Sequence, residues 1–139
     1  MKLMITILTG SYLAVMAVID RRKKKIPVLP GILCTIVIVI AQIMDQTIWW
    51  QWVPGVLIGG SLYVVSKVTK GAIGEGDALV YSLTGVALGF SKNLELFILS
   101  LFFSALTAAI LLVCRRVGRH TRIPFVPFTA VAYGMVMIV

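Results

Sequence analysis

The sequence has very little charge, and acidic residues are much scarcer than basic ones. Of its 139 residues, 13% are charged, 60% are hydrophobic and only five are Asp or Glu. A soluble domain has roughly 25% charged and roughly 45–50% apolar residues. This composition excludes an ordinary soluble fold. It predicts an integral membrane protein in which residues 1–139 form a single polytopic domain.

Cysteine and histidine are also rare. Cys34 and Cys114 lie in separate apolar runs without a C-x-x-C pair, and His120 is the single histidine. Structural zinc sites and disulfide frameworks need clusters of such residues. We therefore expect no metal site, no disulfide and no cofactor, and we assign both cysteines to small apolar positions.

Basic residues are more numerous and are concentrated in short segments. The chain has 13 Lys and Arg and a formal net charge of +8. Binding to nucleic acid is a poor explanation, because no soluble domain is available to carry a groove-reading element. Polybasic segments beside a membrane bind anionic lipid. We assign this role to the longest run, which consists of Arg21, Arg22, Lys23, Lys24 and Lys25.

Long apolar stretches make up most of the chain. An α-helix needs about 20 residues to cross about 30 Å of hydrocarbon, and backbone groups in lipid must be satisfied within the segment. The first stretch is not a cleaved signal peptide, because no A-x-A site closes it and the heavier positive flank follows it. The sequence predicts an all-α protein with six transmembrane helices, at about residues 3–19, 26–44, 48–66, 72–91, 94–114 and 123–139.

The distribution of basic residues predicts the orientation of these helices. If the first helix runs inward, the loops at 20–25, 67–76 and 115–122 are cytoplasmic and hold all the Lys and Arg except Lys2 and Lys92. Cytoplasmic loops carry such an excess. We therefore expect a multi-pass protein of the plasma membrane with both termini outside, and Trp49, Trp50 and Trp52 at the outer interface.

The acidic residues divide between the two sides of this topology. Asp20, Glu75 and Asp77 fall on the cytoplasmic side, whereas Asp45 and Glu95 fall in outer loops. Asp20 closes the first predicted helix and Asp77 opens the fourth. If those two helices pack together, the two carboxyl groups meet near the inner interface.

Such a carboxyl pair has a known chemical use. Two carboxyls that approach within a few ångströms share one proton and titrate as a coupled pair. The ionised partner draws a proton from water as the water attacks a peptide carbonyl, and the protonated partner donates to the developing oxyanion. This is the chemistry of an aspartic protease, and it needs neither a metal nor a Ser or Cys nucleophile.

Each residue near this pair also has a purely structural interpretation. Asp20 could balance the adjacent cations, and Asp77 could be the N-cap of its helix. Glu75 could be an interfacial charge or a substrate contact. Gly74 and Gly76 permit irregular backbone and close approach, either by a neighbouring helix or by a substrate.

Three segments occur in order along the chain: DRRKKKIPVLPG (20–31), GEGDALVYSLTGVALG (74–89) and RIPFVPFTAVAYG (122–134). Taken together, they resemble the type IV prepilin peptidase family, a family of membrane aspartic proteases that includes the archaeal preflagellin peptidases. The resemblance implies that Asp20 and Asp77 are the catalytic pair at the cytoplasmic face. It also implies a pilin-like precursor as substrate, with a basic leader, a Gly before the cut and an apolar helix after it.

Departures from the family pattern concern the substrate and the domain content. The family often has Asn where this chain has Val28, Lys where it has Leu79, and Gly where it has Val126. The resemblance implies a short form that lacks the cysteine-containing domain associated with N-methylation, similar to peptidases of tight-adherence pili or archaeal filaments. Glu75, with Gly74 and Gly76, is then a candidate for binding the basic leader.

Two other functions remain open at this stage. A small transporter or assembly subunit would use Asp20 and Asp77 as a cation or proton site, although no acid lies deep in any predicted helix. A Ser-Lys protease would use Ser66 with Lys67. Adjacent helical positions point about 100° apart, so that dyad would form only if Lys70 replaced Lys67.

Overall fold

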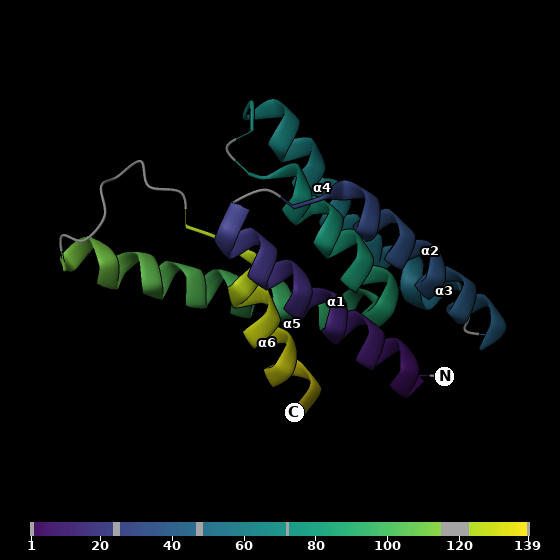
Figure 1. Ribbon diagram of the computed structural model, residues 1–139. Helices are drawn as coiled ribbons and strands as arrows, with labels where there is room; N and C mark the ends of the chain where they lie inside the picture. Colours follow the sequence, from purple (N-terminus) through teal and green to yellow (C-terminus); the bar gives the residue numbers. More distant parts are fainter. Residues whose placement is uncertain (1, 24–25, 47–48, 72, 115–122, 139) are drawn as a thin grey trace.

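The computed structural model describes residues 2–23, 26–46, 49–71, 73–114 and 123–138. These residues are almost entirely helical and contain no strand, which confirms the predicted all-α class. The elements are α1 (Lys2–Lys23), α2 (Val28–Met44), α3 (Trp49–Trp52), the 3-10 helix η1 (Val53–Gly55), α4 (Val56–Val68), α5 (Glu75–Val113) and α6 (Val126–Ile138). Figure 1 shows how they are arranged.

The lengths of the apolar helices support association with a membrane. Two of them, α1 and α5, are long and apolar enough to span a bilayer, and α2 and α6 are shorter apolar helices. Many large hydrophobic side chains on these helices are exposed, as expected for surfaces that face lipid. The arrangement of six crossings with both termini outside stays a prediction.

The fourth and fifth predicted helices are joined without a loop. The sequence predicts separate helices over 72–91 and 94–114, whereas α5 runs through both and is interrupted at Gly89, with φ 78° and ψ 178°. Only glycine adopts such a conformation readily. Thr84 donates a 2.7 Å hydrogen bond to Asn93, and the rings of Tyr81 and Phe97 are 5.2 Å apart, so the second half of α5 folds back across the first.

Side-chain amides stabilise this reversal. Nε2 of Gln42 donates to the carbonyl oxygen of Val86 at 3.0 Å, and Nδ2 of Asn93 donates to those of Gly55 and Tyr81, each at 3.0 Å. Backbone groups in apolar surroundings need such partners. Gln42 and Asn93 are buried polar residues that compensate for the break in the helix.

The third predicted helix, over 48–66, is less regular at its start than expected. Its start is divided into the short helix α3 and η1, and Pro54 lies in η1. Proline lacks the N–H that a regular helix interior needs. Trp49 and Trp50 are exposed and make an edge-to-face contact at 4.8 Å, while their placement at an outer interface stays a prediction.

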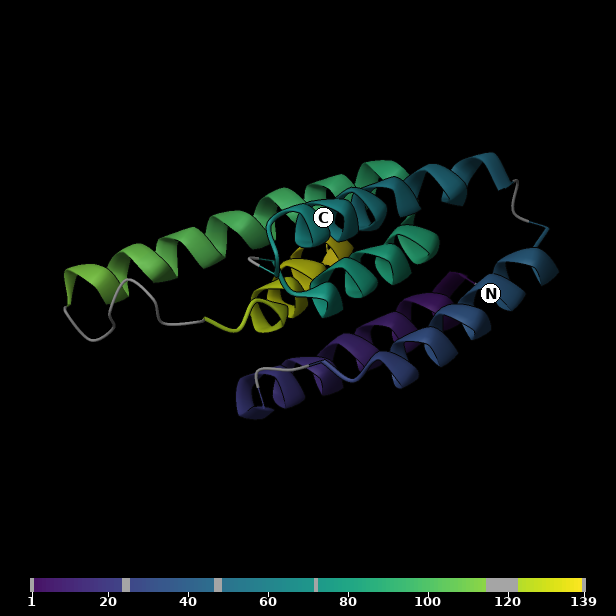
Figure 2. The ribbon, with the colours of Figure 1, turned by 90° about the horizontal axis from the view of Figure 1, so that it is seen from above.

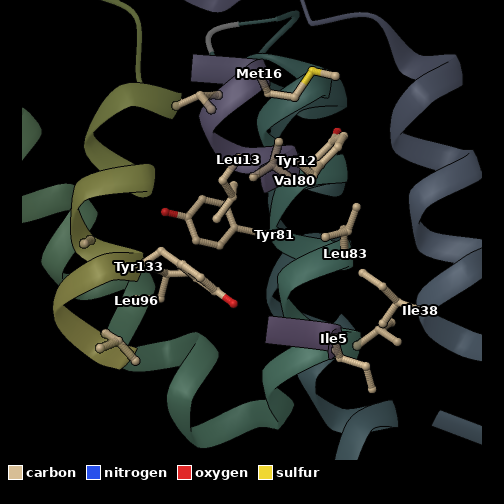
Figure 3. Close-up of a cluster of buried hydrophobic side chains, with 14 of the residues drawn as sticks. Ile5, Tyr12, Leu13, Met16, Ile38, Val80, Tyr81, Leu83, Leu96 and Tyr133 are labelled. Carbon is tan, nitrogen blue, oxygen red and sulfur yellow. The ribbon is translucent and has the colours of Figure 1, made fainter. Parts of the chain in front are cut away.

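The first half of α5 is the centre of the bundle, because α5 contacts every other helix. Figure 2 shows this segment between α2 and α4. Its contact with η1 and α4 is made by backbone: a Cβ added at Gly85 would overlap the carbonyl group of Gly55, and one at Gly55 would overlap that of Gly85. Apolar side chains of α1, α5 and α6 fill the remaining core (Figure 3), among them Leu13, Tyr81, Leu96 and Tyr133.

Candidate active site

Asp20 lies in the last turns of α1 and is buried, with 7% of its surface exposed. Its position follows from helical spacing, because Thr9, Leu13 and Met16 precede it on the same buried face. Its Oδ2 accepts a 3.2 Å hydrogen bond from the backbone N–H of Val126, the first residue of α6. A carboxylate at a helix N-terminus is stabilised by the unpaired N–H groups there.

Asp77 is the third residue of α5 and is partly buried. The alternative that Asp77 is the N-cap is wrong, because Gly74 occupies that position with an extended conformation. The carboxyl group nevertheless reaches back toward the helix end: its Oδ2 lies 3.1 Å from where a Cβ on Gly74 would be. The carboxyl of Asp77 therefore lies beside the exposed Gly74, at the N-terminal end of the central helix.

The structure brings Asp20 and Asp77 to the same end of the bundle. Helices α1 and α5 pack against each other, and Ile26, which follows the end of α1, lies against Gly76, the residue before Asp77. No hydrogen bond joins these two described side chains, since Asp20 is bonded to Val126 instead. The two carboxyls thus lie at the same end of the bundle, Asp20 at the N-terminus of α6 and Asp77 in the first turn of α5.

Gly76 allows another part of the chain to pack closely against the start of α5, as the sequence predicts. A Cβ on this residue would lie 2.6 Å from Cβ of Ile26, in the segment between α1 and α2. That distance is too short for any side chain. Gly76 therefore allows the start of α5 to contact the chain segment that follows the basic run.

Glu75 is exposed and forms an ion pair with the end of α4. Its Oε1 lies 2.6 Å from Nζ of Lys67, and 56% of each side chain is exposed. The hydrogen bond from Lys67 to Glu75 raises the pKa of the lysine, which also lies over the ring of Tyr63 at 5.4 Å from the centroid. The carboxylate of Glu75 is therefore accessible to solvent, and in this conformation it is paired with Lys67.

The Ser-Lys dyad is absent from this arrangement. Ser66 is buried and its Oγ donates a 2.6 Å hydrogen bond to the carbonyl oxygen of Ile73, while Lys67 binds Glu75. The hydroxyl of Ser66 therefore holds the loop between α4 and α5 in place. It is not directed toward a lysine base.

Part of the predicted lipid-binding run is visible beside the site. Arg21, Arg22 and Lys23 continue α1 directly after Asp20, and all three are exposed. Lys24 and Lys25 lie outside the described residues, as does the basic loop at 115–122. Binding of anionic lipid by this run stays a prediction.

Two features of the site were missed by sequence reasoning. One is the Val126 N–H that binds Asp20. The other is a contact one turn deeper, where Oη of Tyr81 lies 3.2 Å from Oγ1 of Thr129, both buried; Figure 3 shows Tyr81 directed toward α6. The spacing of four residues from Asp77 to Tyr81 places both on one helix face, which was the available signal.

Fold and site together define a helical, membrane-associated protein with two carboxyl groups at one end of its bundle. The type IV leader peptidase family matches residues 7–113, a span that contains both Asp20 and Asp77. The chain belongs to this family, and it is therefore assigned as a protease. Comparison with curated proteins and with solved structures gives no match.

Proposed function

We propose that the protein is an aspartic endopeptidase that removes the basic leader of pilin-like precursors at the cytoplasmic face of the membrane. The observation that carries the proposal is the convergence of Asp20 and Asp77 at the ends of two packed helices. Membership in the type IV leader peptidase family supports the same chemistry. A six-helix, multi-pass topology with both termini outside belongs to the proposal.

The surroundings of the two carboxyls suggest different roles for them. Asp20 accepts the N–H at the start of α6, which stabilises its ionised form. Asp20 is therefore the general base that takes a proton from the attacking water. Asp77, beside an exposed glycine, is the general acid that donates a proton to the oxygen of the scissile carbonyl.

The reaction balances without any further group. The water oxygen bonds to the carbonyl carbon as its proton moves to Asp20, and the carbonyl oxygen takes the proton of Asp77. The tetrahedral intermediate then collapses: the hydroxyl proton returns to Asp77, the C–N bond breaks, and the leaving amine takes the proton held by Asp20. Both carboxyls end in their starting protonation states.

The charges around the site favour the cytoplasmic orientation. Arg21, Arg22 and Lys23 extend from the end of α1 that bears Asp20, and Lys67 lies beside Glu75 at the start of α5. Positive residues gather on the cytoplasmic side of membrane proteins. A substrate leader in the cytoplasm would meet the end of the bundle that bears both aspartates.

Cleavage of a co-expressed pilin-like precursor in membranes tests this function. We expect a gel shift with the wild type and none with Asp20→Asn or Asp77→Asn at equal protein level. Asp45→Asn is the matched control, because Asp45 lies at the C-terminal end of α2 and outside the site. Cleavage that survives in both site variants would reject the aspartic mechanism, and its absence with the wild type would reject this substrate class.

A further inference from the structure

A groove of about 550 Å³ lies between α2 and α4, with the first half of α5 as its floor. Both walls pack against α5 rather than against each other, and Figure 2 shows α5 between them. The volume falls within the range of about 300–1,000 Å³ that is typical of ligand sites. Ile32 and Ile36 of α2, Gly60 and Tyr63 of α4, and Ala78 of α5 are part of its lining.

The groove presents an apolar surface even where its residues are polar. The hydroxyl of Thr35 donates to the carbonyl of Gly31 at 2.8 Å, and that of Ser82 donates to the carbonyl of Ala78 at 2.9 Å. Both groups are thus satisfied by their own helices. At Gly60 an added Cβ would meet nothing within 4 Å, so the groove is open at that point.

One end of the groove carries Glu75, the only acid among the described residues that line it. Glu75 begins α5 two residues before Asp77, so the groove starts at the same helical turn as the candidate catalytic carboxyl. Asp77 does not line the groove, so its carboxyl and the groove lie on different sides of that turn. The two sides are connected over Gly74, which is exposed and has no side chain to obstruct a passing chain.

We infer that this groove binds the apolar helix of the precursor, with a basic segment of the precursor against Glu75; the inference rests on the proposed function. In lipid, a chain segment satisfies its backbone only as a helix, and small residues such as Gly60 and Ala78 let a second helix approach closely. Lys67 now forms the ion pair with Glu75 that a basic residue of the bound precursor would form in its place. The peptide bond next to the helix then crosses Gly74 and reaches Asp77.

Photo-crosslinking tests the docking independently of cleavage. A photoreactive benzoylphenylalanine replaces Tyr63 in the full-length Asp20→Asn chain, co-expressed with the precursor in membranes. Phe102 is the matched control position, because it is an exposed aromatic residue on the second half of α5 and does not line the groove. We expect an adduct with the precursor from position 63 and none from position 102.

Substitutions that fill the groove test whether crosslinking at position 63 depends on it. Gly60→Leu is expected to lower the adduct from position 63 by about tenfold or more through steric exclusion, and Ile36→Trp is expected to do the same from the opposite wall. Gly134→Leu is the matched control, since an added Cβ at Gly134, on α6, also meets nothing within 4 Å. Thermal unfolding in detergent shows that each variant is folded.

The outcomes separate this inference from the proposed function. A phospholipid adduct alone at position 63, equal precursor adducts at both positions, or full crosslinking in folded Gly60→Leu and Ile36→Trp would overturn the docking site. If the wild type cleaves the precursor in any of these cases, the proposed function still stands. A groove-dependent adduct without cleavage by the wild type would support docking and reject the peptidase activity.

Discussion

The backbone N–H of Val126 donates a 3.2 Å hydrogen bond to Oδ2 of Asp20, across 106 positions of sequence. The bond joins the end of α1 to the start of α6. It gives the I-P-F-V-P segment a specific structural role, because Pro124 and Pro127 flank the turn into α6 and the free N–H groups of that turn face the carboxyl of Asp20. The last helix therefore belongs to the candidate site.

Two substitutions at Asp20 should separate its structural role from its chemical role. Asp20→Asn keeps an oxygen that accepts the Val126 N–H, so it should fold normally and lose cleavage. Asp20→Ala leaves that buried N–H without a partner, which costs about 1–3 kcal/mol. Thermal unfolding in detergent should therefore show a lower free energy of unfolding for Asp20→Ala than for Asp20→Asn.

The control for this comparison is Asp45→Ala. Asp45 is the C-cap residue of α2, where a carboxylate has no favourable interaction with the helix dipole. Its removal should change the free energy of unfolding by no more than about 0.5 kcal/mol. Equal stability of Asp20→Ala and Asp20→Asn would mean that the Val126 bond contributes nothing to the fold.

The contact between Tyr81 and Thr129 should hold the two aspartates in register. Tyr81 lies about one helical turn after Asp77 on α5, and Thr129 lies about one turn after Val126 on α6. Tyr81→Phe and Thr129→Val should each lower kcat with little change in KM, because misplacement affects the reaction more than binding. In a double-mutant cycle, the coupling between them should be about 0.5–1.5 kcal/mol of unfolding free energy.

Thr107→Val serves as the control for this pair, because the Thr107 hydroxyl donates to the carbonyl of Phe103 in its own helix and has no other partner among the described residues. It should leave kcat and stability close to wild type. A raised KM with unchanged kcat in Tyr81→Phe would assign Tyr81 to substrate binding instead of positioning.

The backbone contact between Gly85 and Gly55 should not tolerate a side chain. In Gly85→Ala the new Cβ overlaps the carbonyl of Gly55, and neither backbone can move without separating α5 from η1. Overpacking of this kind costs about 1–3 kcal/mol, measured as free energy of unfolding. Gly134→Ala, in an open position of α6, should instead be neutral or stabilising by up to about 1 kcal/mol. A Gly85→Ala protein as stable as wild type would contradict this packing.

The helices could be predicted from the sequence because their signal is local. Long apolar runs and the requirement for satisfied backbone groups are enough to identify helices near residues 3–19, 26–44 and 123–139. The predicted topology also requires a reversal between the fourth and fifth helices, but the form of this reversal, at Gly89 and without a loop, was not predictable in this way. It depends on Gln42 and Asn93, which come from another helix and from beyond the turn, and a loop there would satisfy the same local pattern.

The candidate site was predictable to a similar degree. The predicted topology placed Asp20 and Asp77 at helix ends on one side of the membrane, and the family resemblance singled them out as a pair. The partners of these residues come from tertiary structure: Val126 is distant in sequence, and the ion pair between Lys67 and Glu75 forms across a turn whose shape depends on a positive φ at Lys70. No periodicity in the sequence encodes those contacts.

Glu75 should select for a basic substrate leader. Removing its charge in Glu75→Gln should raise KM for the precursor about two- to fivefold, the range expected for an exposed ion pair, with kcat unchanged. Lys67→Met removes the competing cation and should lower KM.

Because both groups are exposed, the two effects should shrink at high salt, where the Debye length falls from about 8 Å toward about 3 Å. Steady-state cleavage at low and high salt measures them, with the exposed Glu95→Gln as a control that changes neither constant. An unchanged KM for Glu75→Gln at low salt would show that the leader binds elsewhere.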